Sequence, residues 1–181
     1  MVGIGSGCKP LAAINLDRTI SIWELSYTRN IGWVRRHRPH HRALEAQSRL
    51  ATLATPGRKR VVLPVGVTDV DNIGSIFRNV AGFEADAVLL DAACADPLYR
   101  KASRVSVGHV FRIPWGVASD LFEALSWLRS LQFRIIALET GPRSIDLRRV
   151  DPGERDVLLV GAEATGIPDD VLAVCDEVVN I

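Results

Sequence analysis

A chain of 181 residues is long enough for one globular domain with its own core, plus an extension. Its hydrophobic share of 48% and charged share of 24% are ordinary for a folded protein, which excludes a wholly disordered chain. The net charge of +1 conceals a division, because residues 1–60 carry 11 basic and 3 acidic residues whereas residues 61–181 carry 11 and 18.

This division predicts a basic N-terminal extension over residues 1–60 and a mildly acidic globular domain over residues 61–181. The three cysteines, Cys8, Cys94 and Cys175, lie far apart and show neither disulfide-framework nor zinc-site spacing. No apolar run reaches the roughly 20 residues that cross a bilayer, and the N-terminus lacks a signal peptide's long apolar stretch. We therefore expect a cytoplasmic protein with no membrane or metal partner.

The densest basic run is residues 35–42, RRHRPHHR. Such a run is either a solvated segment or an RNA contact, in which Arg35 and Arg36 would meet phosphates. Its histidines have no cysteine or acidic neighbours at metal-site spacing. The good helix formers of residues 43–54 predict one helix, which Pro56-Gly57 would end.

From residue 61 onward, short apolar runs rich in β-branched residues alternate with helix-like segments. The runs are residues 61–67, 86–90, 110–113, 133–138, 156–160 and 177–181. The helix-like segments lie near residues 71–82, 97–105, 118–131 and 168–174. Apolar runs of this kind suit strands buried on both faces. The pattern predicts an α/β fold with a mostly parallel sheet of about five or six strands and helices on both faces. Ligands of such sheets lie beyond the carboxyl ends of the strands.

The end of the first predicted strand carries several candidate residues. Asp71 or Asn72 can cap the following helix, and Gly74 permits another backbone to approach closely. Asn72 and Arg78 are six positions apart, which is more than one helical turn, so they share a site only if the loop curls. The alternative is a capped helix with a surface arginine.

The end of the strand at 156–160 carries Gly161, Glu163 and Gly166. Their loop either embraces a small molecule with bare backbone amides or is an ordinary strand-to-helix turn. Taken alone, neither of these two strand ends distinguishes a functional site from an ordinary structural turn.

In combination, these segments resemble the SpoU (TrmH-type) family of RNA 2'-O-ribose methyltransferases, in the SPOUT superfamily. Asn72-Ile73-Gly74 with Arg78 and Ala81-Gly82-Phe83 resembles the family's first motif. Residues 96–115 resemble its middle segment, and Leu159-Val160-Gly161-Ala162-Glu163 with Gly166 resembles its second motif. Ala164 and Asn79 depart mildly from the family pattern. The third motif should begin after Ile181, so we expect a C-terminally truncated domain that binds its cofactor poorly.

The resemblance implies a C-terminal trefoil knot, incomplete here, whose loops bind S-adenosylmethionine. The positions that would line this pocket are Leu138, Gly161, Gly166 and Ile181. It also implies a homodimer that methylates a ribose 2'-hydroxyl of tRNA or rRNA.

In that reaction Arg78 would stabilise the developing alkoxide electrostatically, because a guanidinium keeps its proton in proteins and is a poor free base. Asn72 and Glu163 would shape the site and orient Arg78. Lys101 and Arg104 would contact RNA phosphates, unless they belong to a solvated helix face.

Two other functions remain open. The chain could be a catalytically inactive RNA-binding or partner-binding fragment of the same fold. A nicotinamide enzyme would rest only on the early glycines Gly3, Gly5 and Gly7, which no predicted strand precedes.

Overall fold

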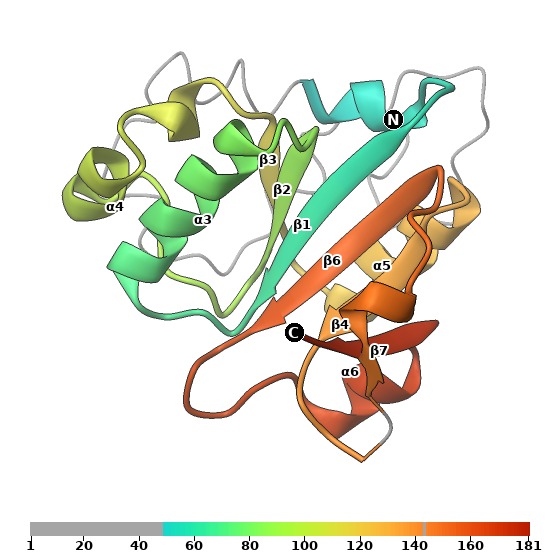
Figure 1. The fold of residues 1–181 in the computed structure, drawn as a ribbon. Helices are drawn as coiled ribbons and strands as arrows, with labels where there is room; N and C mark the ends of the chain where they lie inside the picture. The colour runs from blue at the N-terminus through green and yellow to red at the C-terminus, as the bar shows by residue number, and fades with distance from the viewer. Residues whose placement is uncertain (1–48, 143) are drawn as a thin grey trace, which may run out of the picture.

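The computed structural model describes residues 49–142 and 144–181 and contains one parallel sheet. Its strands are β1 (Lys59–Val65), β2 (Ala87–Asp91), β3 (Trp115–Ala118), β4 (Arg134–Leu138), β5 (Ile145–Asp146), β6 (Arg155–Gly161) and β7 (Glu177–Asn180). They lie in the order β3-β2-β1-β6-β4-β7-β5, with every neighbouring pair parallel (Figure 1). The predicted fold class is confirmed, with seven strands in the described part of the chain instead of five or six.

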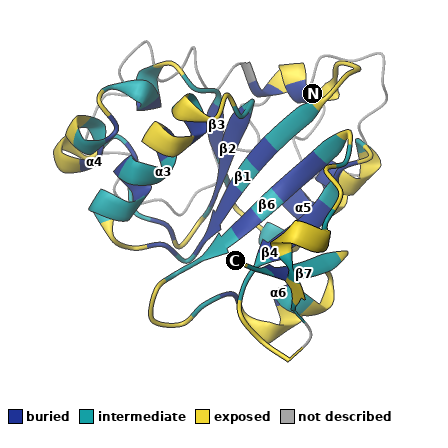
Figure 2. Ribbon diagram, in the orientation of Figure 1, coloured by how far each residue is buried: buried dark blue, intermediate teal, exposed yellow. Residues whose placement is uncertain are grey.

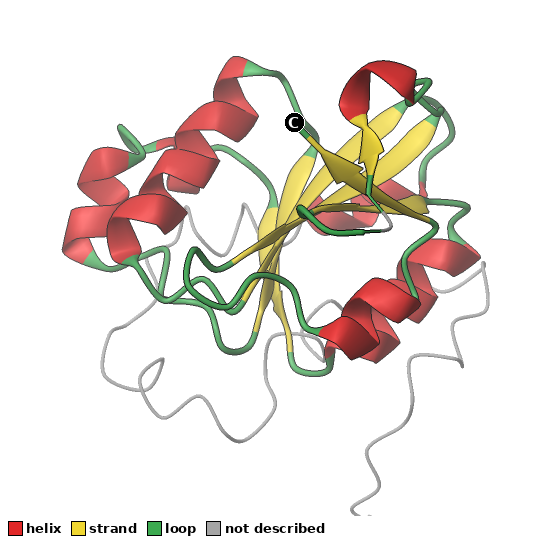
Figure 3. Ribbon diagram, turned by 60° about the horizontal axis from the view of Figure 1, so that its bottom comes forward, coloured by secondary structure: helices red, strands yellow, loops and turns green. Residues whose placement is uncertain are grey.

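Helices cover both faces of the sheet (Figure 3). The α-helices are α3 (Val70–Gly82), α4 (Arg100–Val105), α5 (Leu121–Ser130) and α6 (Asp169–Ala173), and the 3-10 helices are η3 (Arg49–Ala54), η4 (His109–Phe111) and η5 (Leu147–Arg149). Side chains of α3, α4 and η4 pack in one apolar cluster, and those of η3, α5 and α6 pack in the other. None of these described helices combines the length and apolarity that a membrane crossing requires.

The two clusters use opposite faces of the same strands. Val61, Leu63 and Val65 of β1 join the cluster of η3 and α5, whereas Val62 packs against the cluster of α3. This alternation follows from the two-residue period of a strand. Buried residues run along the middle strands in Figure 2, as expected for a sheet covered on both sides.

The predicted strand at 110–113 is wrong. Gly108 has φ +78 and turns the chain into η4, so the apolar side chain of Val110 is buried beneath α3 instead of in the sheet. The indole N–H of Trp115 donates to the Val110 carbonyl oxygen at 2.9 Å, and β3 begins at Trp115 itself.

The predicted helix at 43–54 is described only from residue 49, where the chain forms the 3-10 helix η3. Leu50 and Leu53 are fully buried in the core. The packed domain therefore includes residues before position 61.

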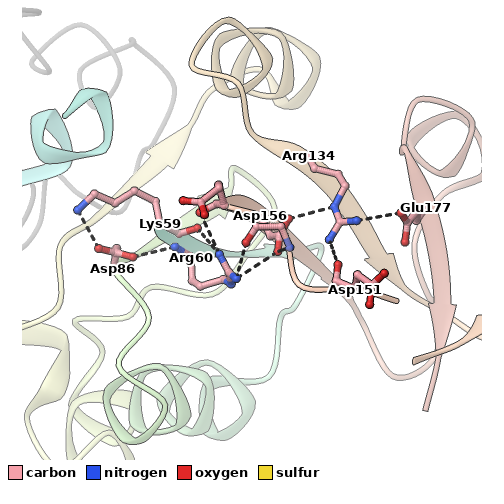
Figure 4. A network of polar contacts seen from close by, with 9 residues as sticks. Lys59, Arg60, Asp86, Arg134, Asp151, Asp156 and Glu177 are labelled. Carbon is pink, nitrogen blue, oxygen red and sulfur yellow. Dashed lines mark hydrogen bonds and ion pairs between the residues drawn. The ribbon is translucent and has the colours of Figure 1, made fainter. Parts of the chain in front are cut away.

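An ionic network joins the amino ends of the central strands (Figure 4). The buried carboxylate of Asp156 accepts from Arg134 Nε and from the Gly153 N–H, both at 3.0 Å, and lies 3.5 Å from the Arg60 guanidinium. Arg134 also donates to Glu177 at 3.0 Å, so β1, β4, β6 and β7 are held together at this edge. The opposite, carboxyl edge carries the loops where ligands of parallel sheets bind.

Candidate active site

The order of the strands predicts where on the carboxyl edge of the sheet a ligand would bind. The chain moves outward from β1 through β2 to β3 and then returns to β4, on the far side of β6. In open parallel sheets the ligand crevice lies where the strand order reverses in this way. That place lies between β1 and β6, and the end of β4 lies on the other side of the end of β6.

A hollow of about 540 Å³ lies beside this place, lined by the ends of β4 and β6, the loop of residues 161–167 and the start of α6. We call it the carboxyl-edge hollow. It gathers four of the residues predicted from the sequence: Leu138, Gly161, Glu163 and Gly166. Ile181 follows β7, is 95% exposed and is not among the lining residues. Its assignment to a cofactor pocket stays a prediction.

Two glycines let the loop of the hollow close on itself. A Cβ on Gly161 would stand 2.4 Å from the Gly166 carbonyl carbon and 2.7 Å from the Ile167 nitrogen. The Gly166 N–H donates to the Ala162 carbonyl oxygen at 2.8 Å, and Gly166 itself has φ +64, which a residue with a Cβ rarely adopts. The sequence therefore places bare backbone around the hollow.

Glu139, directly after β4, was not anticipated from the sequence. Its Oε2 accepts from the Ile167 N–H at 2.9 Å and its Oε1 accepts from its neighbour, the Thr140 N–H, at 3.0 Å. A strand-end carboxylate has no periodic signal in the sequence. Its role is visible only in the structure, where the loop of residues 161–167 passes beside the end of β4 and Glu139 links the strand to the loop.

The first turn of α3 lies at the same edge, because Val65 at the end of β1 pairs with Gly161 at the end of β6. The helix is capped by Asp69, whose Oδ1 accepts from the N–H groups of Asp71 at 2.7 Å and Asn72 at 3.0 Å. These two hydrogen bonds lower the pKa of the Asp69 carboxyl group. The prediction that Asp71 or Asn72 caps the helix is wrong, because the chain enters the helix two residues earlier.

The structure does not join the three predicted catalytic residues within one copy of the chain. Asn72 is half-buried in the first turn of α3, whereas Arg78 is exposed about 9 Å farther along the helix axis. Glu163 is exposed at the rim of the carboxyl-edge hollow. Within residues 49–142 and 144–181, no hydrogen bond or ion pair connects Arg78 to either of the others.

A second hollow, of about 600 Å³, lies beside α4 and is lined by Tyr99, Arg100, Lys101, Arg104 and Val105. We call it the α4 hollow. Lys101 Nζ lies 2.6 Å from Asp71 Oδ2, and this hydrogen bond raises the pKa of the Lys101 ammonium. The sequence indicated Lys101 and Arg104 but not the exposed Tyr99 and Arg100 next to them. Arg35 and Arg36, predicted as further RNA contacts, lie outside the described residues.

Gly74 allows α4 to lie against α3. A Cβ at this position would stand 2.7 Å from Val105 Cβ and 2.8 Å from the Ala102 carbonyl oxygen. The predicted close backbone approach at Gly74 is confirmed, and it places the α4 hollow beside the first turn of α3. In the described part of the chain, no group of three or more His, Cys, Asp or Glu residues is arranged to hold a metal ion.

A parallel sheet with a glycine-containing loop and a hollow beside its reversal point is an arrangement in which α/β proteins commonly hold a small molecule. The family model of the SpoU rRNA Methylase family matches residues 59–181, and the chain belongs to this family. The predicted family is confirmed.

Similar proteins and solved structures are consistent with membership of this family. The chain is 41% identical over 128 residues to the uncharacterized tRNA/rRNA methyltransferase Mb0905 of Mycobacterium bovis, covering 69% of this chain and 44% of that protein. It is 33% identical over 132 residues to an uncharacterized tRNA/rRNA methyltransferase of Mycobacterium ulcerans, covering 72% of this chain and 42% of that one. The chain therefore spans less than half the length of these relatives.

Among solved structures, the AdoMet-bound rRNA methyltransferase from Sinorhizobium meliloti matches with a TM-score of 0.64 and 27% identity, over 71% of this chain and 48% of that one. The SpoU methyltransferase AviRb from Streptomyces viridochromogenes matches with a TM-score of 0.67 and 23% identity, over 73% of this chain and 53% of that one. The second likeness supports the fold alone.

Proposed function

We propose that the protein transfers a methyl group from S-adenosylmethionine to a ribose 2'-hydroxyl of tRNA or rRNA. The observation that carries the proposal is the carboxyl-edge hollow, formed by the family's glycine loop beside the reversal point of the sheet. Membership of the SpoU rRNA Methylase family and the AdoMet-bound rRNA methyltransferase of similar fold support it.

The residues of the hollow fit this cofactor. A volume of about 540 Å³ lies within the range of small-molecule sites, about 300–1,000 Å³. The tightly closed loop that begins at Gly161 forms one wall of the hollow, and Leu138 and Leu172 supply apolar surface for a nucleobase. When bound, S-adenosylmethionine supplies an electrophilic methyl group on a positively charged sulfur.

The protein's part in the chemistry is to make a ribose hydroxyl nucleophilic. A hydroxyl attacks poorly at neutral pH, so a fixed positive charge beside the developing alkoxide accelerates the reaction while the hydroxyl proton passes to water. Arg78 fits this role because its guanidinium is exposed and no described residue neutralises it. Asn72 and Glu163 would then shape the site around the reacting groups.

Because Arg78 and Glu163 are not joined within one copy, we also propose that the working enzyme is a homodimer whose interface completes the site. The RNA itself would add to this arrangement through a phosphate held by Arg78. Sedimentation of the protein with and without RNA tests the dimer directly.

The α4 hollow is the proposed RNA contact of the described domain. Arg100 and Arg104 are exposed cations, and Tyr99, 56% exposed, offers a ring on which an unpaired base can stack. Lys101 contributes less, since its ammonium is already bound to Asp71. A cytoplasmic location, where tRNA and rRNA are found, is part of the same proposal.

The decisive experiment supplies methyl-labelled S-adenosylmethionine and total tRNA or ribosomal RNA, followed by digestion to nucleosides. Label recovered as 2'-O-methylnucleosides supports the proposal, whereas label on a base refutes the ribose assignment. Salt-sensitive RNA binding without transfer would favour the alternative, an inactive RNA-binding module of the same fold.

A further inference from the structure

Glu139 occupies an unusual place in the carboxyl-edge hollow. Its two carboxylate oxygens each accept one backbone N–H, from Ile167 at 2.9 Å and Thr140 at 3.0 Å. A Cβ on Gly166 would stand only 2.4 Å from the Glu139 Oε2 atom. Because Gly166 has no side chain, the carboxylate can reach the loop. The side chain is therefore held in position and cannot turn into solvent without releasing the loop.

The charge of Glu139 is not cancelled nearby. The charged residues that line the hollow are all acidic: Glu139, Glu163 and Asp169. No ion pair formed between described residues involves any of the three. Glu163 and Asp169 are exposed, whereas Glu139 is half-buried, so its charge is the least screened by water.

We propose that Glu139 determines the specificity of the hollow by favouring the positively charged sulfonium cofactor over the neutral thioether product. This inference rests on the proposed function. S-adenosylmethionine carries one more positive charge than S-adenosylhomocysteine, and the two are otherwise alike except for the methyl group. A fixed carboxylate in the same hollow therefore binds the first more tightly and promotes release of the second.

The test compares two conservative variants by calorimetric titration with S-adenosylmethionine and S-adenosylhomocysteine. Glu139→Gln keeps an acceptor oxygen for the Ile167 N–H but removes the charge. We expect the affinity ratio of cofactor to product to fall about five-fold, because the unit charge that distinguishes the two compounds loses its counter-charge in a partly screened site. Glu154→Gln, an exposed acid at the opposite edge of the sheet, is the matched control and should leave the ratio unchanged.

A second measurement needs no ligand. Hydrogen exchange at the Ile167 amide should be slowed by the Glu139 bond, little changed in Glu139→Gln and faster by about ten-fold or more in Glu139→Ala. Equal exchange in all three proteins would show that Glu139 does not hold the loop, and would overturn the inference.

The outcomes separate the two proposals. If the unsubstituted protein binds S-adenosylmethionine and Glu139→Gln leaves the ratio unchanged, the specificity role fails while the proposed function stands. If the unsubstituted protein binds neither compound, the proposed cofactor fails, and the specificity role fails with it.

Discussion

Gly161→Ala gives the sharpest test of the loop that closes the carboxyl-edge hollow. The new methyl group would stand 2.4 Å from the Gly166 carbonyl carbon, 2.7 Å from the Ile167 nitrogen and 2.8 Å from the Gly166 oxygen. All three atoms belong to the backbone, so no flexible side chain can move aside. The loop must shift, or β6 must lose its last ladder contact with Val65.

Forcing one methyl group into so tight a contact costs about 1–3 kcal/mol of unfolding free energy. Urea unfolding by linear extrapolation measures this difference. Because the displaced groups line the hollow, S-adenosylmethionine binding should weaken at least ten-fold in the same variant. Gly82→Ala is the matched control: nothing lies within 4 Å of its new Cβ, and an alanine at this helical position should stabilise α3 slightly. Wild-type stability and affinity in Gly161→Ala would refute the argument that bare backbone at this position shapes the hollow.

Four further outcomes are expected. Arg78→Ala should abolish methyl transfer without lowering the melting temperature, because the exposed guanidinium has no structural partner among the described residues. Deleting residues 1–42 should weaken RNA binding and flatten its salt dependence, as judged by titration at several salt concentrations. Arg134→Ala should destabilise the fold by about 2–3 kcal/mol in urea unfolding, since it leaves the buried Asp156 carboxylate short of a partner. Asp69→Asn should flatten the loss of thermal stability as the pH falls below the ordinary aspartate pKa of 3.8.

The sign of the last effect follows from the cap. Hydrogen bonds from the backbone lower the folded-state pKa of Asp69 from its ordinary 3.8, so its contribution is complete above pH 3.8 and is lost as the pH falls through the folded value. An unchanged acid profile would contradict this reasoning. For Arg78, wild-type transfer by the alanine variant would remove it from the mechanism, and for the deletion, an unchanged salt slope would show a merely solvated extension.

The alternation of strands and helices could be predicted because each central strand is an apolar run long enough to be seen. The short edge strand Ile145–Asp146 could not, since two residues carry no periodic signal. The error at 110–113 has a different cause: Val110 is as buried as any strand residue, but in the layer beneath α3. Burial alone does not distinguish a strand from a buried turn.

The candidate site likewise contains residues that could be predicted from the sequence and one that could not. Gly161, Glu163 and Gly166 are close in sequence, and Leu138 ends an apolar run, so their meeting at one edge could be predicted. Glu139 could not, because its importance depends on where a loop 28 positions later passes. The roles of Asn72, Arg78 and Ile181, and the knot implied by the resemblance, stay predictions.

The central pairing of β1 with β6 has a consequence for synthesis of the chain on the ribosome. It joins segments far apart in sequence, as shown by the hydrogen bond between Arg60 and Glu154, 94 positions later. At about 5–20 residues per second, β1 waits roughly 5–20 seconds after its own synthesis before its partner exists. During that interval one edge of an apolar strand has nothing to pair with, which is the condition under which nascent chains aggregate or bind chaperones. Slower translation between the two strands would lengthen this exposure, so the yield of folded protein should depend on elongation rate as well as on stability.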